Sequence, residues 1–438
     1  MNSRWTNFAP RLGFAYQITP KTVLRGGWGL FYSPENDARE DILTKNYPFA
    51  ELNQYINYYY NGPCVVGPQQ PTCDGLYNYQ LDQGLPRNTT VNIPSGGASI
   101  PTKNIPSGTL LTSYYVDPNL KTGYSELFNV ALQQELGANF TLEAAFVGSK
   151  SHHLSYEVGD LNFDPATGGE GYITPNLGKL QYLTDLGWAQ YHSLQMKLTK
   201  RVSENLNFLA SYTYAHNIDN GPAPFNLGVN SNYPQNPHNL DAEIASADGD
   251  VRHNFVFSGI YHLPFGRGQA LLSGVGKAWD MVVGGWELNG ILTLHTGTPI
   301  NVVRGASLTT CPGVRPDLIG DPYHIPESLR NEPNTDWYFN PQAFDVSKYS
   351  GSHACDPGTL SRNYLRGQSF ASADASIFKN FTFRENLRLQ TRLEAFNVSN
   401  TPHFAGADGV FTDGTFGQVK APPSGSMRVV QLAAKIIF

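Results

Sequence analysis

The chain has 438 residues, of which 40% are hydrophobic, and a formal net charge of −6. The negative charge argues against a nucleic-acid partner, and the lack of any run of about 18 apolar residues excludes a helical membrane protein. The length exceeds the size at which a single globular core usually stops growing, yet nothing in the sequence marks a boundary between globular domains. We therefore predict one large sheet that is closed or closing.

Aromatic residues are abundant, with 24 tyrosines, 24 phenylalanines and 6 tryptophans. Such a content is typical of a membrane barrel with aromatic girdles at its two interfaces. The 43 glycines and 30 prolines favour long irregular loops between the strands.

The first predicted hairpin begins with a strand in which Leu12, Phe14, Tyr16 and Ile18 share one face. A loop from Ser33 to Thr122 follows, and its length and low periodicity favour an exposed functional loop over a linker. After it, alternating apolar residues define a second hairpin with a clear register.

Continued along the chain, the period-two pattern predicts eleven strands. They span Arg11–Ile18, Thr22–Tyr32, Tyr124–Leu136, Phe140–Gly148, Gln190–Val202, Leu206–Tyr214, Val251–His262, Gly285–Gly297, Ala371–Asn380, Asn386–Phe396 and Met427–Phe438.

Long and short connections alternate strictly between these strands. The long loops are Ser33–Thr122, Ser149–Ala189, Ala215–Asp250, Thr298–Phe370 and Asn397–Ser426, and the one overlong turn is Leu263–Trp279. Outer-membrane barrels have short turns on the periplasmic side and long loops outside. We therefore predict an all-β fold, a transmembrane antiparallel β-barrel of the cell outer membrane with long extracellular loops, represented here by about eleven strands.

The terminal strand, Met427–Phe438, has one wholly apolar face. Its alternation predicts that Leu432, Ala434, Ile436 and Phe438 face lipid, while Gln431 and Lys435 face the lumen.

Four cysteines lie in loop-like stretches rich in proline and glycine, and no CxxC motif occurs. This pattern favours disulfides that staple loops in an oxidising compartment over zinc or redox sites. We predict the pairs Cys64–Cys73 and Cys311–Cys355.

Candidate chemistry is sparse. Asp248, Asp250, Arg252 and His253 have the residue types of a metal or acid/base cluster, but their position at a strand start favours rim or lumen-facing residues. No preorganised nucleophile, base and orienting carboxylate can be identified, so we expect neither an enzyme nor a cofactor or metal site.

An aromatic run in the first long loop consists of Tyr55, Tyr58, Tyr59 and Tyr60, interspersed with asparagines. Flat rings stack on the apolar faces of sugars, so this run is a candidate ligand-contacting platform. An interfacial girdle or plain loop packing is the alternative that we favour.

Four segments of the chain resemble the C-terminal barrel of Oar-like TonB-dependent receptors. They are DVRHNFVFSGIYHLPFG (Asp250–Gly266), GWELNGILTLHTGTPINV (Gly285–Val302), LQTRLEAFNVSNTPHF (Leu389–Phe404) and the closing RVVQLAAKIIF. The resemblance covers nearly all of the chain and is strongest after Tyr124.

The resemblance implies a transporter barrel of about 22 strands around an N-terminal plug, driven by the TonB complex in a Gram-negative bacterium, for uptake of an unknown ligand. It also implies that the terminal strand, with Leu432, Ile436 and Phe438, is the signal recognised by the barrel-assembly machinery. The plug that usually precedes such a barrel is not in this sequence.

Strand parity leads to the same expectation. Single-chain bacterial barrels have an even number of strands, whereas eleven are predicted here. We therefore expect residues 1–438 to be the C-terminal part of a receptor barrel, whose N-terminal half and plug are missing partners. A structural or adhesive outer-membrane protein, without energised transport, remains the alternative.

Overall fold

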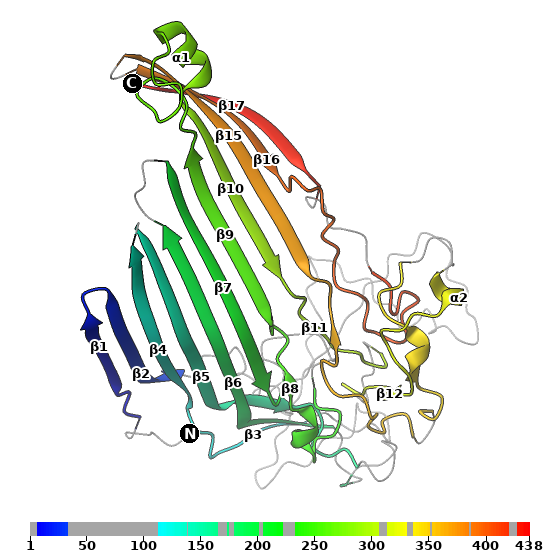
Figure 1. The fold of residues 1–438 in the computed structure, drawn as a ribbon. Helices are drawn as coiled ribbons and strands as arrows, with labels where there is room; N and C mark the ends of the chain where they lie inside the picture. The colour runs from blue at the N-terminus through cyan, green and yellow to red at the C-terminus, as the bar shows by residue number, and fades with distance from the viewer. Residues whose placement is uncertain are drawn as a thin grey trace, which may run out of the picture.

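The fold is that of a computed structural model, which describes residues 7–33, 113–137, 139–164, 173–174, 179–200, 205–221, 233–305, 313–330, 336–350, 353–384, 387–419 and 427–438. Eleven long strands form one antiparallel sheet, in which each strand pairs with the next long strand along the chain (Figure 1). The sheet confirms the predicted fold class. The strands are β1 (Arg11–Thr19), β2 (Thr22–Ser33), β4 (Gly123–Gly137), β5 (Phe140–Val158), β6 (Leu180–Lys200), β7 (Leu206–Asp219), β9 (His253–His262), β10 (Trp286–His295), β15 (Phe370–Arg384), β16 (Leu387–Phe396) and β17 (Val429–Ile437).

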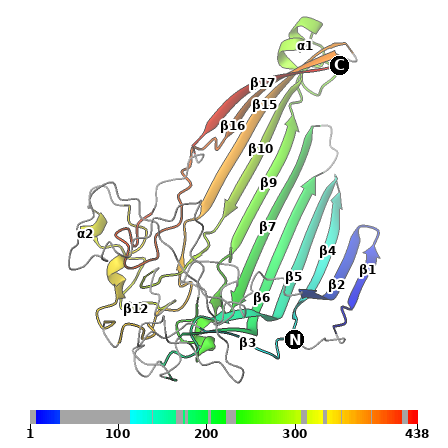
Figure 2. The ribbon, with the colours of Figure 1, turned by 180° about the vertical axis from the view of Figure 1, so that it is seen from behind.

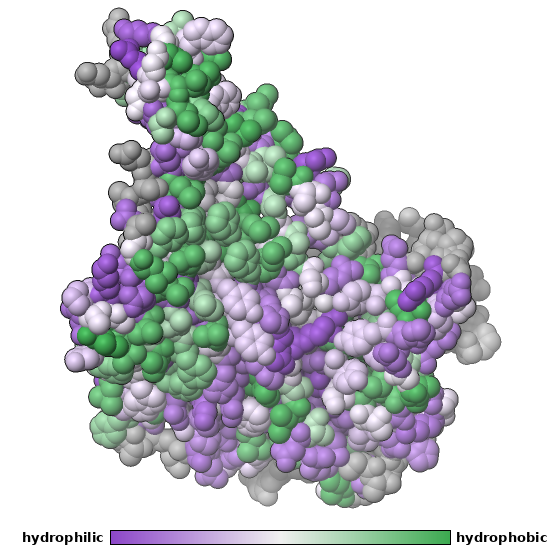
Figure 3. Space-filling model, viewed as in Figure 1, coloured by the Kyte–Doolittle hydropathy of each residue, from purple (hydrophilic) through white to green (hydrophobic). Residues whose placement is uncertain are grey.

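One face of this sheet, here called the apolar face, carries hydrophobic side chains from strand to strand. Because side chains alternate along each strand, the cross-strand register decides which residues meet on a face. One row of paired residues crosses nine strands, and consists of Tyr16, Leu24, Leu132, Ala144, Met196, Tyr212, Phe255, Leu294 and Ala371. Figure 3 shows hydrophobic residues gathered over the strands and mainly hydrophilic residues at the loop end.

The opposite face, here called the polar face, holds charged and amide side chains. Arg25 Nη2 lies 2.6 Å from Glu143 Oε2 and donates a 3.0 Å hydrogen bond to Gln133. At the other end of the sheet, the Gln431 amide donates to the Glu394 carboxylate. The two faces therefore have the alternation that the sequence predicts.

Both edges of the sheet are open. In the described part of the chain, β1 pairs only with β2 and β17 pairs only with β16. Figure 2 shows the resulting curved wall from behind, with β1 and β17 at its two sides.

Several strands are longer than the sequence predicts, and β5 and β6 extend furthest beyond their predicted bounds. β5 continues to Val158 and β6 begins at Leu180, so much of the predicted Ser149–Ala189 loop belongs to a hairpin. The extra residues include SKSHH, which is polar on both faces. The hydrophobic alternation that locates strands disappears there, although the backbone ladder continues. Short β3 (Ser113–Val116) pairs in parallel with β6, inside the predicted Ser33–Thr122 loop.

The last two long loops form a compact unit, here called the loop module, made of residues 297–305, 313–330, 336–350, 353–369 and 397–419. Its small sheets pair β11 (Pro299–Ile300) with β14 (Leu365–Arg366) and β12 (Asp317–Leu318) with β13 (Phe344–Asp345); it also holds α2 (Glu327–Arg330) and the 3-10 turn η6 (Pro341–Ala343). Its core consists of Val302, Phe339, Ala343, Phe344, Leu360, Leu365 and Phe416. These predicted loops therefore have a hydrophobic core of their own.

The overlong turn between β9 and β10 contains one helix, α1 (Lys277–Val283). It lies at the end of the sheet opposite the loop module, beside β15 and β17 (Figure 1). No helix in the described ranges is long and apolar enough to span a membrane.

Candidate functional site

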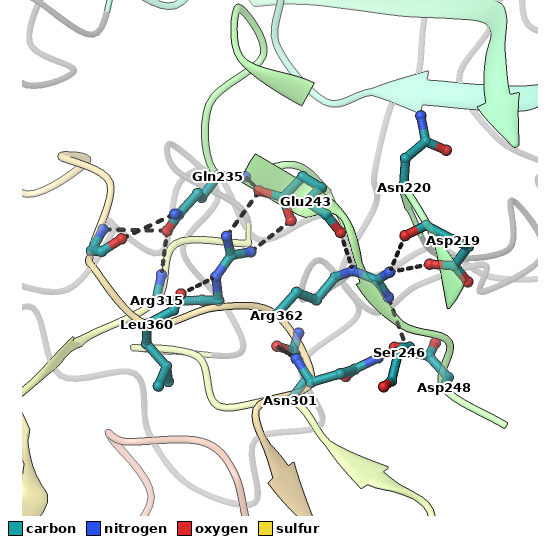
Figure 4. Close-up of polar contacts among 12 residues, drawn as sticks. Asp219, Asn220, Gln235, Glu243, Ser246, Asp248, Asn301, Arg315, Leu360 and Arg362 are labelled. Atoms are coloured by element: carbon teal, nitrogen blue, oxygen red, sulfur yellow. Dashed lines mark hydrogen bonds and ion pairs between the residues drawn. The ribbon is translucent and has the colours of Figure 1, made fainter. Parts of the chain in front are cut away.

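The candidate site is a buried polar network at the loop end of the sheet, where separate connections meet (Figure 4). It joins the end of β7, the β7–β9 connection and the loop module. The β7–β9 connection carries the 3-10 turn η5 (Leu240–Glu243) and β8 (Ala245–Ser246), which pairs with β7.

The centre of this network is an ion pair between Arg315 of the loop module and Glu243 of η5. Both side chains are only 1% exposed, and the guanidinium binds the carboxylate in a bidentate manner at 2.7 and 3.0 Å. Arg315 Nε donates a third hydrogen bond, of 2.8 Å, to the Leu360 carbonyl oxygen. A buried charge is tolerated only when it is paired and hydrogen-bonded in this way.

Arg362 extends the network to the sheet. Its Nη2 donates to the Asp219 carboxylate at the end of β7, and its Nε donates to the Glu243 backbone oxygen at 3.0 Å. Its Nη1 lies 3.4 Å from Asp248 Oδ1. One arginine of the loop module therefore contacts three points of β7 and the β7–β9 connection.

A buried glutamine, Gln235, forms hydrogen bonds to the backbone of the loop module and to the Glu243 carboxylate. Its side-chain oxygen accepts from the backbone nitrogens of Arg315 and Gly358 at 3.3 and 3.2 Å, and its amide nitrogen donates to the Gly358 oxygen at 3.1 Å. Its own backbone nitrogen donates to Glu243 Oε1 at 3.1 Å. The loop module and the β7–β9 connection are thus joined by side-chain and backbone bonds together.

The predicted rim group at the start of β9 lies beside this network. Asp250 is 1% exposed and pairs with Arg252 at 3.0 Å and with Arg366 of β14. His253 instead contacts the Tyr212 hydroxyl, at 2.8 Å. The residues occupy a strand start, and no group of three or more His, Cys, Asp or Glu in the described part of the chain could hold a metal ion.

A second polar cluster lies in the loop module around Asp317. The Tyr349 hydroxyl donates a 2.6 Å hydrogen bond to the Asp317 carboxylate, and the Thr359 backbone nitrogen donates one of 2.9 Å. The Lys348 ammonium forms an ion pair with the same carboxylate. Burial raises the pKa of the Asp317 carboxyl, but these hydrogen bonds outweigh that effect and hold the pKa at about 2. Burial, followed by the hydrogen bond to Asp317, raises the pKa of Tyr349 to about 12.

Arg304 differs from the other buried arginines because no carboxylate among the described residues pairs with it. Its Nη2 donates to the Asp356 backbone oxygen at 2.6 Å, and its guanidinium carbon lies 3.8 Å from the centre of the Tyr349 ring. Its Nε and Nη1 are buried without a hydrogen-bond partner, and burial lowers its pKa. The ring face partly replaces a counter-charge.

A groove of about 550 Å³ lies on the polar face near the turn end of β7, β9 and β10. Three of its lining residues, Leu209, Ile260 and Ile291, are hydrophobic and exposed, although they lie on the polar face. The buried Asn289 side-chain nitrogen has no hydrogen-bond partner there. The sequence prediction missed this groove, although the interruption of alternation at Ile260 and Ile291 was a signal for it.

The other predicted site residues have different outcomes. The run Tyr55, Tyr58, Tyr59 and Tyr60 lies outside the described residues, as do Cys64, Cys73 and Cys311. Cys355 is disulfide-bonded, buried, and packed with Phe163 and Val314; the predicted pairing itself stays a prediction.

The terminal-strand residues lie at the edge of the sheet. The register places Leu432 and Ile436 of β17 on the apolar face, opposite Leu393 and Leu389 of β16. Phe438, just beyond the strand, is 96% exposed. The role of these residues as an assembly signal remains a prediction.

Comparison with known proteins provides a family. A model described as an outer membrane beta barrel domain matches residues 1–431. The outer membrane transporter YddB from Escherichia coli has a TM-score of 0.47 and 11% identity, covering 98% of this chain and 40% of its own. The FrpB iron transporter from Neisseria meningitidis has a TM-score of 0.43 and 9% identity, covering 97% and 38%. The chain therefore spans less than half of these structures, and no curated protein matches it.

Proposed function

The chain belongs to the outer membrane beta barrel domain family, and on that premise we propose that it is the C-terminal barrel wall of an Oar-like TonB-dependent receptor. Its apolar face lies against the lipid of the cell outer membrane, and its polar face lines the lumen. The receptor captures an extracellular ligand at the loop end and takes it up with energy from the TonB complex.

The observation that carries this proposal is the buried network between the loop module and the barrel wall. Arg315, Glu243 and Arg362 fix the module to β7 and the β7–β9 connection through contacts that are almost fully dehydrated. A loop that serves only as a connection has no need of such bonds. Loops held in one arrangement bind a ligand at a lower entropic cost, because little ordering is required on binding.

The groove on the polar face supports the proposed plug. Exposed Leu209, Ile260 and Ile291 form an apolar area inside a polar lumen, and such an area is better covered by a folded domain than by water. The buried Asn289 side-chain nitrogen offers a donor to that domain. In the proposed receptor, a plug encoded upstream in the chain covers this groove and contacts the TonB complex.

The open edges of the sheet support the proposed missing barrel half. Each unpaired backbone group exposed to hydrocarbon costs several kcal/mol, and both β1 and β17 present such an edge. Additional strands between these two edges would close the wall. We further propose that β17 is inserted through the barrel-assembly machinery.

The experiment compares the producing bacterium with a strain that lacks the gene. Mass spectrometry of the medium identifies compounds that only the producing strain removes, with and without a protonophore. The proposal predicts at least one compound whose removal requires both the gene and the proton gradient. Removal that is insensitive to the protonophore, or no removal, would instead indicate the structural or adhesive function.

A further inference from the structure

The turn between β9 and β10 places α1 against the apolar face of the sheet. Together they form a groove of about 870 Å³ at the turn end, close to the C-terminus. Its lining is mainly hydrophobic and includes Met281, Val282, Trp286, Ile377, Leu393 and Leu432, whereas Lys379, Thr391 and Arg392 are its polar members. The groove therefore combines one helix with parts of β10, β15, β16 and β17, and extends from the turn end toward the middle of the sheet.

Two contacts hold α1 in this position. The Trp286 indole nitrogen donates a 2.9 Å hydrogen bond to the Val282 oxygen, and Lys379 Nζ donates to the Gly284 oxygen at the end of the helix. The Lys379 ammonium also lies 5.3 Å from the centre of the Trp286 ring and 5.1 Å from that of Phe381. These contacts explain how a lysine on the apolar face is only 5% exposed.

The surface around the groove has the composition of a membrane interface. Leu271, Leu272 and Trp279 are each about half exposed or more, at 49%, 53% and 67%. The same turn carries two exposed basic residues, Arg267 and Lys277. Exposed tryptophan and leucine next to basic residues are typical of segments that lie in the headgroup region of a bilayer.

We propose that this groove holds one anionic glycerophospholipid of the periplasmic leaflet, and that α1 is an interfacial anchor that closes over it. An acyl chain lies between Val282 and Leu432, where the family fold places the surface in lipid. The phosphate lies at the headgroup level near Arg267 and Lys277, whose charge it complements. This inference does not depend on transport or on its ligand.

A bound lipid is favoured over a protein partner because the groove opens on the lipid-facing side of the wall. The occupant must therefore reach it through the membrane, and a phospholipid already has both the apolar chain and the charged head that the two parts of the surface require. A second copy of the chain on this face is the competing outcome, and the experiment below separates the two.

The test is native mass spectrometry of the closed receptor barrel that contains this chain, purified folded from outer membranes, after titration with phosphatidylglycerol or phosphatidylcholine. Wild-type protein is expected to retain one phosphatidylglycerol after extensive delipidation. Ala434→Phe fills the groove without adding charge, and is expected to lose that lipid. The matched control, Ala210→Phe, makes the same change on the apolar face of β7 outside the groove and is expected to retain it.

A double variant, Arg267→Gln with Lys277→Gln, tests the headgroup contact. It is expected to retain phosphatidylglycerol and phosphatidylcholine equally, while the wild type prefers phosphatidylglycerol by about tenfold. Equal lipid retention by wild type and Ala434→Phe would overturn the proposal. So would a wild type that retains no lipid, or a dimer that Ala434→Phe abolishes.

Discussion

The buried Arg315–Glu243 pair shows how a single contact organises the loop end. Taking both charges out of water costs several kcal/mol per ion, and the bidentate bond with its extra hydrogen bonds offsets this cost. Losing one partner leaves an unpaired buried charge. Replacing both residues by apolar ones removes the ion pair, but it also removes the cost of taking its two charges out of water.

We therefore predict that Arg315→Met destabilises the loop module by about 3–5 kcal/mol, and that adding Glu243→Leu restores most of that stability. Limited proteolysis of the folded protein, followed by mass spectrometry of fragments from the loop module, measures the effect. Arg330→Met, which removes an exposed arginine from the same module, is the control and should leave cleavage unchanged. A double variant as labile as the single one would contradict this account.

The Asp317 carboxyl makes the loop module sensitive to acid. Its folded pKa of about 2 lies below the ordinary value of 3.8. The stability that it contributes is therefore complete above the ordinary pKa and is lost as the pH falls from about 4 to about 2. Pepsin is active in this range, so cleavage near Tyr349 measures the loss directly.

As the pH falls across this interval, the rate of pepsin cleavage is expected to rise more steeply for the wild-type protein than for Asp317→Asn, because the asparagine side chain does not titrate. The variant corrects for the pH dependence of pepsin itself. Parallel curves for the two proteins would show that Asp317 does not stabilise the module.

The residue-scale features were the hardest to predict from sequence. The rim position of Asp250 followed from its place at a strand start. The partners in the network are far apart in the chain, with a separation of 72 positions for Arg315 and Glu243 and of 143 positions for Arg362 and Asp219. A local pattern contains no information on such pairs, because folding of the loops alone brings them together.

At the scale of elements, the hydrophobic alternation predicted the eleven long strands and their order. It failed at SKSHH (residues 149–153) of β5, which is polar on both faces, so that the strand was ended too early and its partner β6 was begun too late. It also could not predict the loop module, whose strands of two residues are too short to show a period.

Strand β17 provides a direct test of which face meets lipid. An arginine at mid-depth on the lipid side of a barrel costs about 2–4 kcal/mol, so Leu432→Arg should impair folding into the membrane. Gln431→Arg, one residue away on the polar face, should be tolerated. Heat-modifiable migration in electrophoresis, measured on the closed barrel that contains both halves, gives the folded fraction. Equal sensitivity at both positions would contradict the register.

The four cysteines belong to stretches that the sequence predicts as loops. We predict the disulfides Cys64–Cys73 and Cys311–Cys355, each contributing on the order of 2–4 kcal/mol, mainly to local loop order. Peptide mapping by mass spectrometry under non-reducing conditions identifies the pairs. Peptides that link Cys355 to Cys64 or Cys73 would refute this pairing.

At the scale of the whole molecule, the curved sheet connects the loop module with the turn that carries α1. The loop module lies at one end of the sheet and α1 lies at the other (Figures 1 and 2). In the proposed receptor, capture at the loop end and coupling at the turn end would both require a closed lumen. The two edges of the sheet are therefore central to the account.

The most direct test is closure. Residues 1–438 are produced with an added signal peptide, either alone or together with the N-terminal half of an Oar-like barrel, and heat-modifiable migration and conductance in planar bilayers are measured. The account predicts no stable pore from residues 1–438 alone, and a closed, conducting barrel when both halves are present. A stable, monomeric, closed barrel formed by residues 1–438 alone would contradict it.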